Sequence, residues 1–130
     1  MGTKVLTVDD DPDVRAFVVT VLEENGYAPL SAQNGEEGMN AIKAEGPDLV
    51  ILDVLMPRGS GVRLYRELRT DASLNHIPVI VLSGITKKSF LRSQKALTEF
   101  RGGEVPEPEA YLEKPVKAAE LAETIKNVIG

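Results

Sequence analysis

Five side chains that could bind a cation or an anionic group stand at the ends of short apolar runs in the sequence. They are an acidic pair, a third aspartate, a hydroxyl and an ammonium group: Asp9, Asp10, Asp53, Ser83 and Lys114. Carboxylates that lie close together repel one another unless one of them is protonated or a cation enters. A site made of oxygen ligands suits a hard cation, and Mg²⁺ binds to one or two carboxylates together with water. With an ammonium group, such a cation could neutralise the oxygens of a phosphoryl group that a carboxylate attacks.

Asp53 stands in the stretch around which the rest of the chain is organised, LVILDVLMPRGSG at residues 49–61. Four apolar residues lead directly into this aspartate, which predicts a buried strand of a parallel sheet. Pro57, Gly59 and Gly61 then indicate a loop. In open α/β sheets, ligands bind at the carboxyl ends of the strands, so a carboxylate here is a candidate for chemistry. A structural role stays open at this point, because aspartate also caps loops and helices.

The other polar residues have structural interpretations too. Asp11 and Asp13 are expected to cap a helix, because Pro12 follows Asp11 and proline is favoured at the first helical position. Ser83 by itself is typical of a turn, and Lys114 by itself is typical of a solvated surface. All five candidate side chains stand at predicted strand ends, however, and this coincidence favours a common site.

Strand and helix patterns alternate five times along the chain. Short β-rich or apolar runs predict strands at Lys4–Val8, Tyr27–Ala32, Leu49–Asp53, Val79–Ser83 and Ala110–Glu113. Apolar residues at helical spacing predict helices from Pro12 to the Asn25-Gly26 pair, and then at Glu36–Glu45, Gly61–Arg69, Lys87 to about Phe100, and Ala118–Ile129. The second strand is weak, because Pro29 interrupts it.

This alternation predicts an α/β fold with a parallel sheet and helices on both faces. Right-handed crossovers leave few topologies, and we expect the flavodoxin-like, doubly wound (βα)5 arrangement with strand order 2-1-3-4-5. Its switch point lies between the first and third strands, which are followed by Asp9, Asp10 and Asp53. Three carboxylates are therefore expected in the crevice where this fold binds ligands.

Composition limits the functional classes. The chain has 130 residues, enough for one domain over residues 1–130 with a core of its own. A net charge of −5 argues against a broad nucleic-acid-binding face. The chain has no cysteine and one histidine, His76, so we exclude thiol chemistry and a multi-histidine metal site. No apolar run is long enough to span a membrane and no signal peptide precedes the first strand, so we expect a cytoplasmic protein.

Four motifs in this order resemble the receiver domains of two-component response regulators. They are VLTVDDDP at residues 5–12, VILDVLMPRGSG at 50–61, PVIVLSG at 78–84 and YLEKPV at 111–116, and the resemblance covers the whole chain. It implies a CheY-like fold and a signalling switch rather than a classical enzyme. Such a domain takes a phosphoryl group from a sensor histidine kinase or a histidine phosphotransfer protein and then changes a partner-binding face. Direct binding to DNA or to a membrane is not expected.

The resemblance also implies roles for residues at matching positions. Asp53 is expected to be the phosphoacceptor. Asp10 is expected to ligate Mg²⁺ directly, and Asp9 largely through a bound water. The backbone carbonyl of Leu55 is expected to complete the protein ligands of the metal.

The resemblance implies that a second group of residues binds and senses the phosphoryl group. Ser83 is expected to bond one phosphoryl oxygen and Lys114 another, while Tyr111 stands at the position of the family's switch aromatic. Gly84 fills a position that needs a small residue beside the phosphoryl group. The peptide bond before Pro115 is expected to be cis, because receivers use this turn to aim the lysine at the site.

Two features depart from the family pattern. The spacing from Ser83 to Lys114 is longer than in most receivers, which predicts a longer fourth helix and an extended loop from Arg101 to Pro108 on the usual output face. Leu55 and Ile85 stand where receivers often carry polar side chains. These apolar groups cannot help an attacking water, so we expect a long-lived phosphoryl group.

Two other functions stay open from the sequence. A degenerate receiver could serve as an interaction module without phosphorylation. A phosphatase of the haloacid-dehalogenase type uses an Asp-x-Asp pair after its first strand, here Asp9 and Asp11, but this leaves Asp53 unexplained and Pro12 does not suit its loop.

Overall fold

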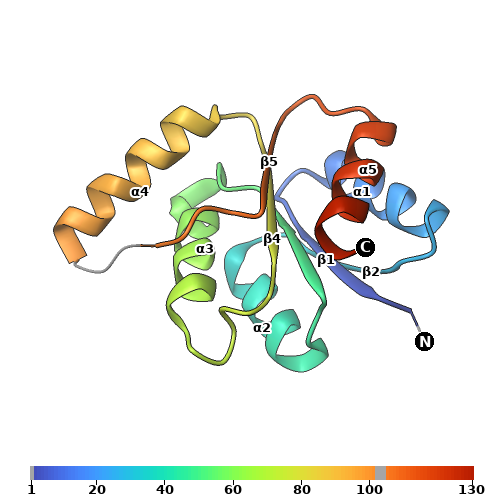
Figure 1. Cartoon of the computed structure of the whole chain (residues 1–130), viewed down its shortest axis with the longest axis horizontal. Helices are drawn as coiled ribbons and strands as arrows, with labels where there is room; N and C mark the ends of the chain where they lie inside the picture. Colours follow the sequence, from blue (N-terminus) through green and yellow to red (C-terminus); the bar gives the residue numbers. More distant parts are fainter. Residues whose placement is uncertain (1, 102–104) are drawn as a thin grey trace.

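The computed structural model describes the backbone of residues 2–101 and 105–130, and the side chains of all of these except residues 97–101. Strands and helices alternate along the chain, as Figure 1 shows. The strands are β1 (Lys4–Val8), β2 (Ala28–Ala32), β3 (Leu49–Leu52), β4 (Val79–Ser83) and β5 (Ala110–Glu113). The helices are α1 (Pro12–Glu24), α2 (Gly35–Glu45), α3 (Ser60–Thr70), α4 (Lys87–Arg101) and α5 (Ala118–Ile129), with a short 3-10 helix, η1 (Pro57–Gly59), before α3.

The five strands form one parallel sheet with the order β2-β1-β3-β4-β5. This order confirms the predicted doubly wound fold. The outermost strand on one side of the sheet is β2, where Pro29 lies opposite Val5 of β1. Proline lacks the N–H that a central strand needs, so its place on an edge strand is physically reasonable.

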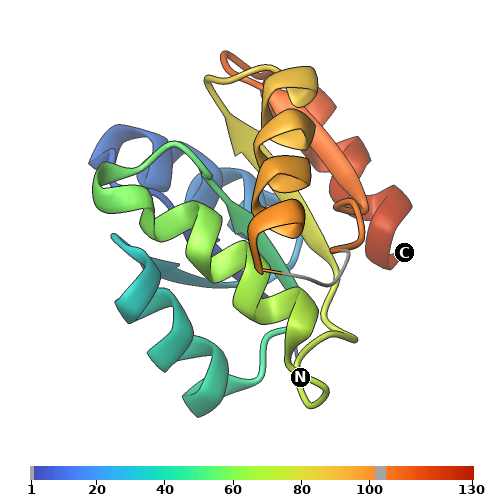
Figure 2. The same cartoon turned by 90° about the vertical axis from the view of Figure 1, so that its left-hand side faces the viewer.

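Helices cover both faces of the sheet (Figures 1 and 2). The helices α2, α3 and α4 lie on one face, and α1 and α5 lie on the other. Successive side chains of a strand point to opposite faces. In β3, Val50 and Leu52 therefore join the core under α2, α3 and α4, while Leu49 and Ile51 join the core under α1 and α5. Burial on both faces explains why β3 is apolar throughout.

Caps define where the helices begin next to the strand ends. The side chain of Asp11 accepts hydrogen bonds from the backbone N–H groups of Asp13 (2.8 Å) and Val14 (3.4 Å), so α1 starts immediately after the β1 loop. Asn34 caps α2 in the same way. At its other end, α2 stops at Gly46, which is in the left-handed region with φ of 56°.

Several predicted boundaries are wrong by one residue, and one loop start is misplaced. The strand β2 begins one residue later than expected, and β3 ends one residue earlier, so Asp53 is the first residue of the following loop. Helices α2 and α3 each begin one residue earlier than expected. Arg101 belongs to α4, so the loop predicted from Arg101 to Pro108 begins after it, and residues 102–104 of that loop lie outside the described residues. In the part of the chain that the structure describes, no helix is long and apolar enough to cross a membrane.

Candidate functional site

Three carboxylates meet at the carboxyl edge of the sheet. Asp9 and Asp10 follow β1, and Asp53 follows β3, which is the neighbour of β1. Carboxylate oxygens of the three residues all lie within 4.8 Å of one another. Asp9 and Asp53 are 2% and 4% exposed, whereas Asp10 is exposed to solvent. The convergence expected at the switch point of the fold is therefore present.

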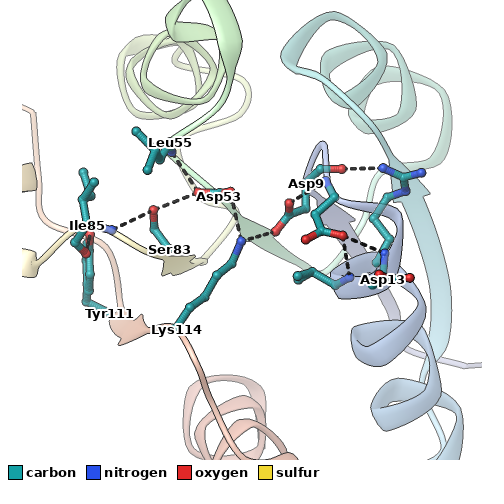
Figure 3. A network of polar contacts seen from close by, with 11 residues as sticks. Asp9, Asp13, Asp53, Leu55, Ser83, Ile85, Tyr111 and Lys114 are labelled. Atoms are coloured by element: carbon teal, nitrogen blue, oxygen red, sulfur yellow. Dashed lines mark hydrogen bonds and ion pairs between the residues drawn. The ribbon is translucent and has the colours of Figure 1, made fainter.

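The carboxylate of Asp53 is held by groups from three segments (Figure 3). One of its oxygens, Oδ1, accepts hydrogen bonds from the backbone N–H of Leu55 and from the hydroxyl of Ser83, each at 2.8 Å. The other oxygen, Oδ2, lies 3.1 Å from the ammonium nitrogen of Lys114. Ser83 is fully buried at the end of β4. Both side chains that were expected to contact a phosphoryl group thus already contact the carboxylate that would carry it.

A glycine allows the loop after Asp53 to close tightly. A Cβ atom added at Gly61 would lie 2.2 Å from the carbonyl oxygen of Asp53 and 2.8 Å from Cα of Val54. No side chain fits in that space, because real Cβ atoms do not approach other heavy atoms so closely. The first turn of α3 therefore rests directly on the backbone of Asp53 and Val54.

The ammonium group of Lys114 bridges two buried carboxylates. Its nitrogen lies 2.9 Å from Oδ2 of Asp9 and 3.1 Å from Oδ2 of Asp53. Its backbone N–H donates to the carbonyl of Ser83 at 2.8 Å, which ties the end of β5 to the end of β4. The next peptide bond, to Pro115, is cis, the isomer expected from the sequence. Burial alone would lower the pKa of Lys114, but its hydrogen bonds and charge interactions with the two carboxylates outweigh that effect and raise it.

Asp9 is held in place by its own neighbours in the chain. Its Oδ1 accepts a hydrogen bond from the backbone N–H of Asp11 at 2.9 Å, and its carbonyl accepts one from the guanidinium of Arg15 at 2.7 Å. Burial raises the pKa of Asp9, and the charge of Asp53 acts in the same direction. The N–H of Asp11 and the ammonium of Lys114 oppose this shift without cancelling it. Ionisation of Asp9 in the folded protein therefore costs more free energy than ionisation of an ordinary, solvated aspartate.

The donor set fits a hard divalent cation. Asp9, Asp10 and Asp53 offer oxygen atoms only, and oxygen is the ligand atom that Mg²⁺ prefers. Among the described residues, the side chain of Asp10 makes no hydrogen bond or ion pair, so its carboxylate is free to bind a ligand. A bound cation would also offset the burial and the repulsion from Asp53 that together raise the pKa of Asp9. Asp11 is different, because its carboxylate is engaged as the cap of α1. A phosphatase that relies on both Asp9 and Asp11 is therefore not supported.

The aromatic residue of β5 lies beside the loop that follows Ser83. The hydroxyl of Tyr111 donates a hydrogen bond to the carbonyl of Ile85 at 2.7 Å. Its ring lies 5.6 Å from the ring of Phe90, the buried aromatic of α4. Burial, with the charges of Glu113 and Asp53, raises the pKa of Tyr111 to about 12, so the phenol is a neutral donor under ordinary conditions. A movement of the carbonyl of Ile85 would either break this hydrogen bond or carry the hydroxyl of Tyr111 with it.

A polar network around the buried side chain of Arg69 anchors the segment that precedes β5. The guanidinium of Arg69 donates to the carboxylate of Glu109 at 2.5 Å and to the carbonyls of Ile77 and Glu107 at 3.3 and 3.4 Å. The hydroxyl of Tyr65 donates to the carbonyl of Pro106. Burial works against the charge of Arg69, but its hydrogen bonds and charge interactions with Tyr65 and Glu109 outweigh that effect and raise its pKa. The described end of the long loop, residues 105–109, is thus fixed against α3.

Comparison with known proteins identifies the family. A family model described as "Response regulator receiver domain" matches residues 5–126. The chain belongs to this family of receiver domains. As a receiver domain, it is a module of two-component signalling and not a classical enzyme, and domains of this family interact with histidine kinases and output domains.

Individual relatives agree with this assignment. The chain is 33% identical over 127 residues to protein PilH of Pseudomonas aeruginosa, covering 98% of each chain. It is 30% identical over 129 residues to the phosphate regulon transcriptional regulatory protein PhoB of Escherichia coli, covering 99% of this receiver but 52% of PhoB. This receiver therefore spans about half the length of PhoB. A solved structure of the chemotaxis response regulator CheY4 of Vibrio cholerae matches with a TM-score of 0.80 and 26% identity, covering 98% of this receiver and 99% of that chain.

The site contains residues to which the sequence analysis assigned no role in the site. Arg15 holds the carbonyl of Asp9, and Gly61 makes room for the backbone of Asp53. A signal for Gly61 was present, because glycine is less stable than alanine inside a helix and is used where segments of the chain approach closely. Arg15 carries no such signal, since an arginine in the first turn of a surface helix is unremarkable on its own.

Proposed function

We propose that this receiver domain, over residues 1–130, accepts a phosphoryl group on Asp53 with the help of Mg²⁺ in the cytoplasm. The donor is a sensor histidine kinase or a histidine phosphotransfer protein. The observation that carries the proposal is the set of bonds around one carboxylate. Asp53 lies in a cluster of three carboxylates, and both Ser83 and Lys114 already bond to it.

The reaction is a transfer between two nucleophiles. A carboxylate oxygen of Asp53 attacks the phosphorus of a phosphohistidine, the P–N bond breaks, and its electron pair leaves with the imidazole. The product is an acyl phosphate on Asp53. Positioning and charge neutralisation are most of what such a transfer asks of a protein.

Residues of this chain supply those two effects. Asp10 would bind the metal directly, Asp9 would act largely through a bound water, and the carbonyl of Leu55 with Asp53 would complete the protein ligands. When bound, Mg²⁺ neutralises charge on the phosphoryl oxygens. Lys114 would leave the carboxylate of Asp53 to pair with one phosphoryl oxygen, and Gly84 would leave room for the group.

The signal would pass from the phosphoryl group to the outer surface. An acyl phosphate adds charge and acceptor oxygens, so the hydroxyl of Ser83 would turn from the carboxylate to a phosphoryl oxygen. The loop after Ser83 would then move inward with Ile85, whose carbonyl holds the hydroxyl of Tyr111. Tyr111 would follow, and this would alter the face made by α4, β5 and α5. Couplings of this kind are worth about 1–3 kcal/mol.

Exposure to a small phosphodonor tests the proposal. The protein is incubated with acetyl phosphate, with Mg²⁺ or with EDTA, and its intact mass is measured. A mass increase of one phosphoryl group that requires Mg²⁺ is expected. An unchanged mass with Mg²⁺ would favour the degenerate receiver, which acts only as an interaction module.

A further inference from the structure

The outer face of α4 carries a stripe of exposed cations. Lys88, Arg92 and Lys95 are exposed and follow one another at intervals of four and three residues, so they lie on one side of the helix. Phe90 and Gln94, on the opposite side, are buried against the body of the protein. Figure 2 shows α4 in front of the sheet, with its outer side open along its length.

This stripe stands out against the charge of the remaining chain. Residues 72–98 contain four cations and no aspartate or glutamate. The net charge of −5 is therefore the balance of +4 in this stretch and −9 elsewhere. One of the four cations, Lys87, already lies 3.6 Å from the carboxylate of Glu107. Within residues 2–96 and 105–130, the side chains of Lys88, Arg92 and Lys95 have no hydrogen-bond or ion-pair partner.

We propose that the outer face of α4 binds an acidic segment of a partner protein. Positive charges that are exposed and unpaired steer and orient an oppositely charged partner. Lys88 and Lys95 are separated by about 10 Å along the helix axis. That length matches two turns of a partner helix or a few residues of an extended peptide with spaced Asp or Glu side chains.

Two other anionic partners fit this surface less well. A nucleic acid presents phosphates over a much longer distance than the stripe, so most of its length would lie beyond the stripe, next to the rest of a chain whose net charge is −9. A membrane surface requires apolar side chains beside the cations. Among the described residues, Leu55 is the one large hydrophobic side chain that is exposed, and it lies near Asp53 rather than on α4.

The inference deepens the proposed function, because it names the chemistry of the partner on the face that phosphorylation would alter. The inference depends on the proposed function only for the idea that phosphorylation regulates partner binding. Binding itself is measured on the unphosphorylated protein, so a failed phosphorylation assay and a failed binding assay are separate results.

Binding of a fluorescent oligoglutamate peptide to the full chain at low salt tests the inference. The triple variant Lys88→Gln, Arg92→Gln, Lys95→Gln is compared with a matched control, Lys43→Gln, Arg63→Gln, Lys126→Gln, which removes the same charge from exposed positions on other helices. We expect the α4 variant to bind roughly tenfold or more weakly, the control to bind like the wild type, and added salt to weaken all binding. Circular dichroism checks that both variants remain folded.

The inference fails if the wild type does not bind the peptide, or if the control loses as much affinity as the α4 variant. Duplex DNA and phosphatidylserine vesicles are tested beside the peptide. Tighter binding to either than to the peptide would also overturn it.

Discussion

The ammonium nitrogen of Lys114 lies 3.1 Å from Oδ2 of Asp53, although the two residues are 61 positions apart in the chain. The contact exists because β5 and β3 flank β4, so their carboxyl ends open onto the same crevice. In the absence of a metal, this ammonium group offsets the charge of Asp53 and also that of Asp9. A phosphoryl group on Asp53 would meet a cation that is already in place.

The buried carboxylate of Asp9 should make stability depend on pH in a defined direction. Its raised pKa means that the folded protein favours the protonated form more than the unfolded chain does. Below the ordinary value of 3.8, Asp9 is protonated in both states, and the stability that its protonated form gives to the folded state is fully present. As the pH rises through the raised pKa, the folded state loses this relative stability. Asp9→Asn, which stays neutral, should therefore become more stable than the wild type in EDTA as the pH approaches neutrality.

Denaturant unfolding of both proteins in EDTA, from below pH 3.8 to neutrality, measures this difference. Asn keeps an oxygen that can accept from the N–H of Asp11. A variant less stable than the wild type at neutral pH would contradict the assignment of burial as the dominant cause.

Mg²⁺ binding should depend on Asp10 and not on Asp11. The carboxylate of Asp10 is exposed at the carboxyl cluster, while that of Asp11 caps α1. Asp10→Ala should weaken Mg²⁺ binding by tenfold or more, since loss of an outer-shell partner alone costs about 10–100-fold. Asp11→Ala should instead lower the free energy of unfolding by about 1 kcal/mol. Calorimetric titration of both variants with Mg²⁺ measures the two affinities. An equal loss of Mg²⁺ affinity would count against Asp10 as the metal ligand and Asp11 as the helix cap.

The carboxylate of Glu109 should matter to stability more than its exposed position suggests. It accepts from the buried guanidinium of Arg69 at 2.5 Å and from the backbone N–H of Val79 at 2.6 Å. Glu109→Ala should lower the free energy of unfolding by about 2 kcal/mol or more, because a buried charge and a strand N–H lose their acceptor. Glu107→Ala is the control: its pair with Lys87 is exposed, and such pairs contribute about 0–1 kcal/mol. Equal effects of the two variants would exclude a structural role for the network.

The phosphoryl group on Asp53 should be long-lived, because Leu55 and Ile85 flank the site with apolar side chains that cannot position an attacking water. Leu55 is 59% exposed beside Asp53, and Ile85 lies on the same side in Figure 3. Leu55→Asn or Ile85→Gln should speed hydrolysis on the order of tenfold, the effect of about 1.36 kcal/mol in the barrier. Leu55→Met is the control that keeps the apolar bulk. Decay of the Mg²⁺-bound phosphoprotein gives the rates, and unchanged rates in the polar variants would show that shielding does not set the lifetime.

Local patterns in the sequence were sufficient to predict the fold. The apolar runs and turn residues predicted the strands and helices, and the strand order expected for a doubly wound fold is confirmed. Pro29 marked a strand that proved to be an edge. The carboxyl ends of parallel strands share one edge of a sheet, so the sequence also predicted that Asp9, Asp53 and Lys114 meet there. The contacts of Lys114 with both carboxylates agree with that prediction.

What the sequence did not reveal depends on contacts between distant segments. The bond from Arg69 to Glu109 joins α3 to the segment before β5, and neither residue type nor spacing signals that pairing. The close approach of Gly61 to Asp53 likewise depends on how α3 sits on the end of β3. Such contacts follow from the tertiary arrangement and not from periodicity or turn chemistry.

The central claim is that Asp53 is the phosphoacceptor, and mapping the phosphoryl group tests it most directly. Wild type, Asp53→Asn and a control, Asp71→Asn on the loop after α3, are treated with acetyl phosphate and Mg²⁺, and their intact masses are measured. Wild type and the control should each gain one phosphoryl group, and Asp53→Asn should gain none. One phosphoryl group on Asp53→Asn, at the wild-type level, would contradict the assignment.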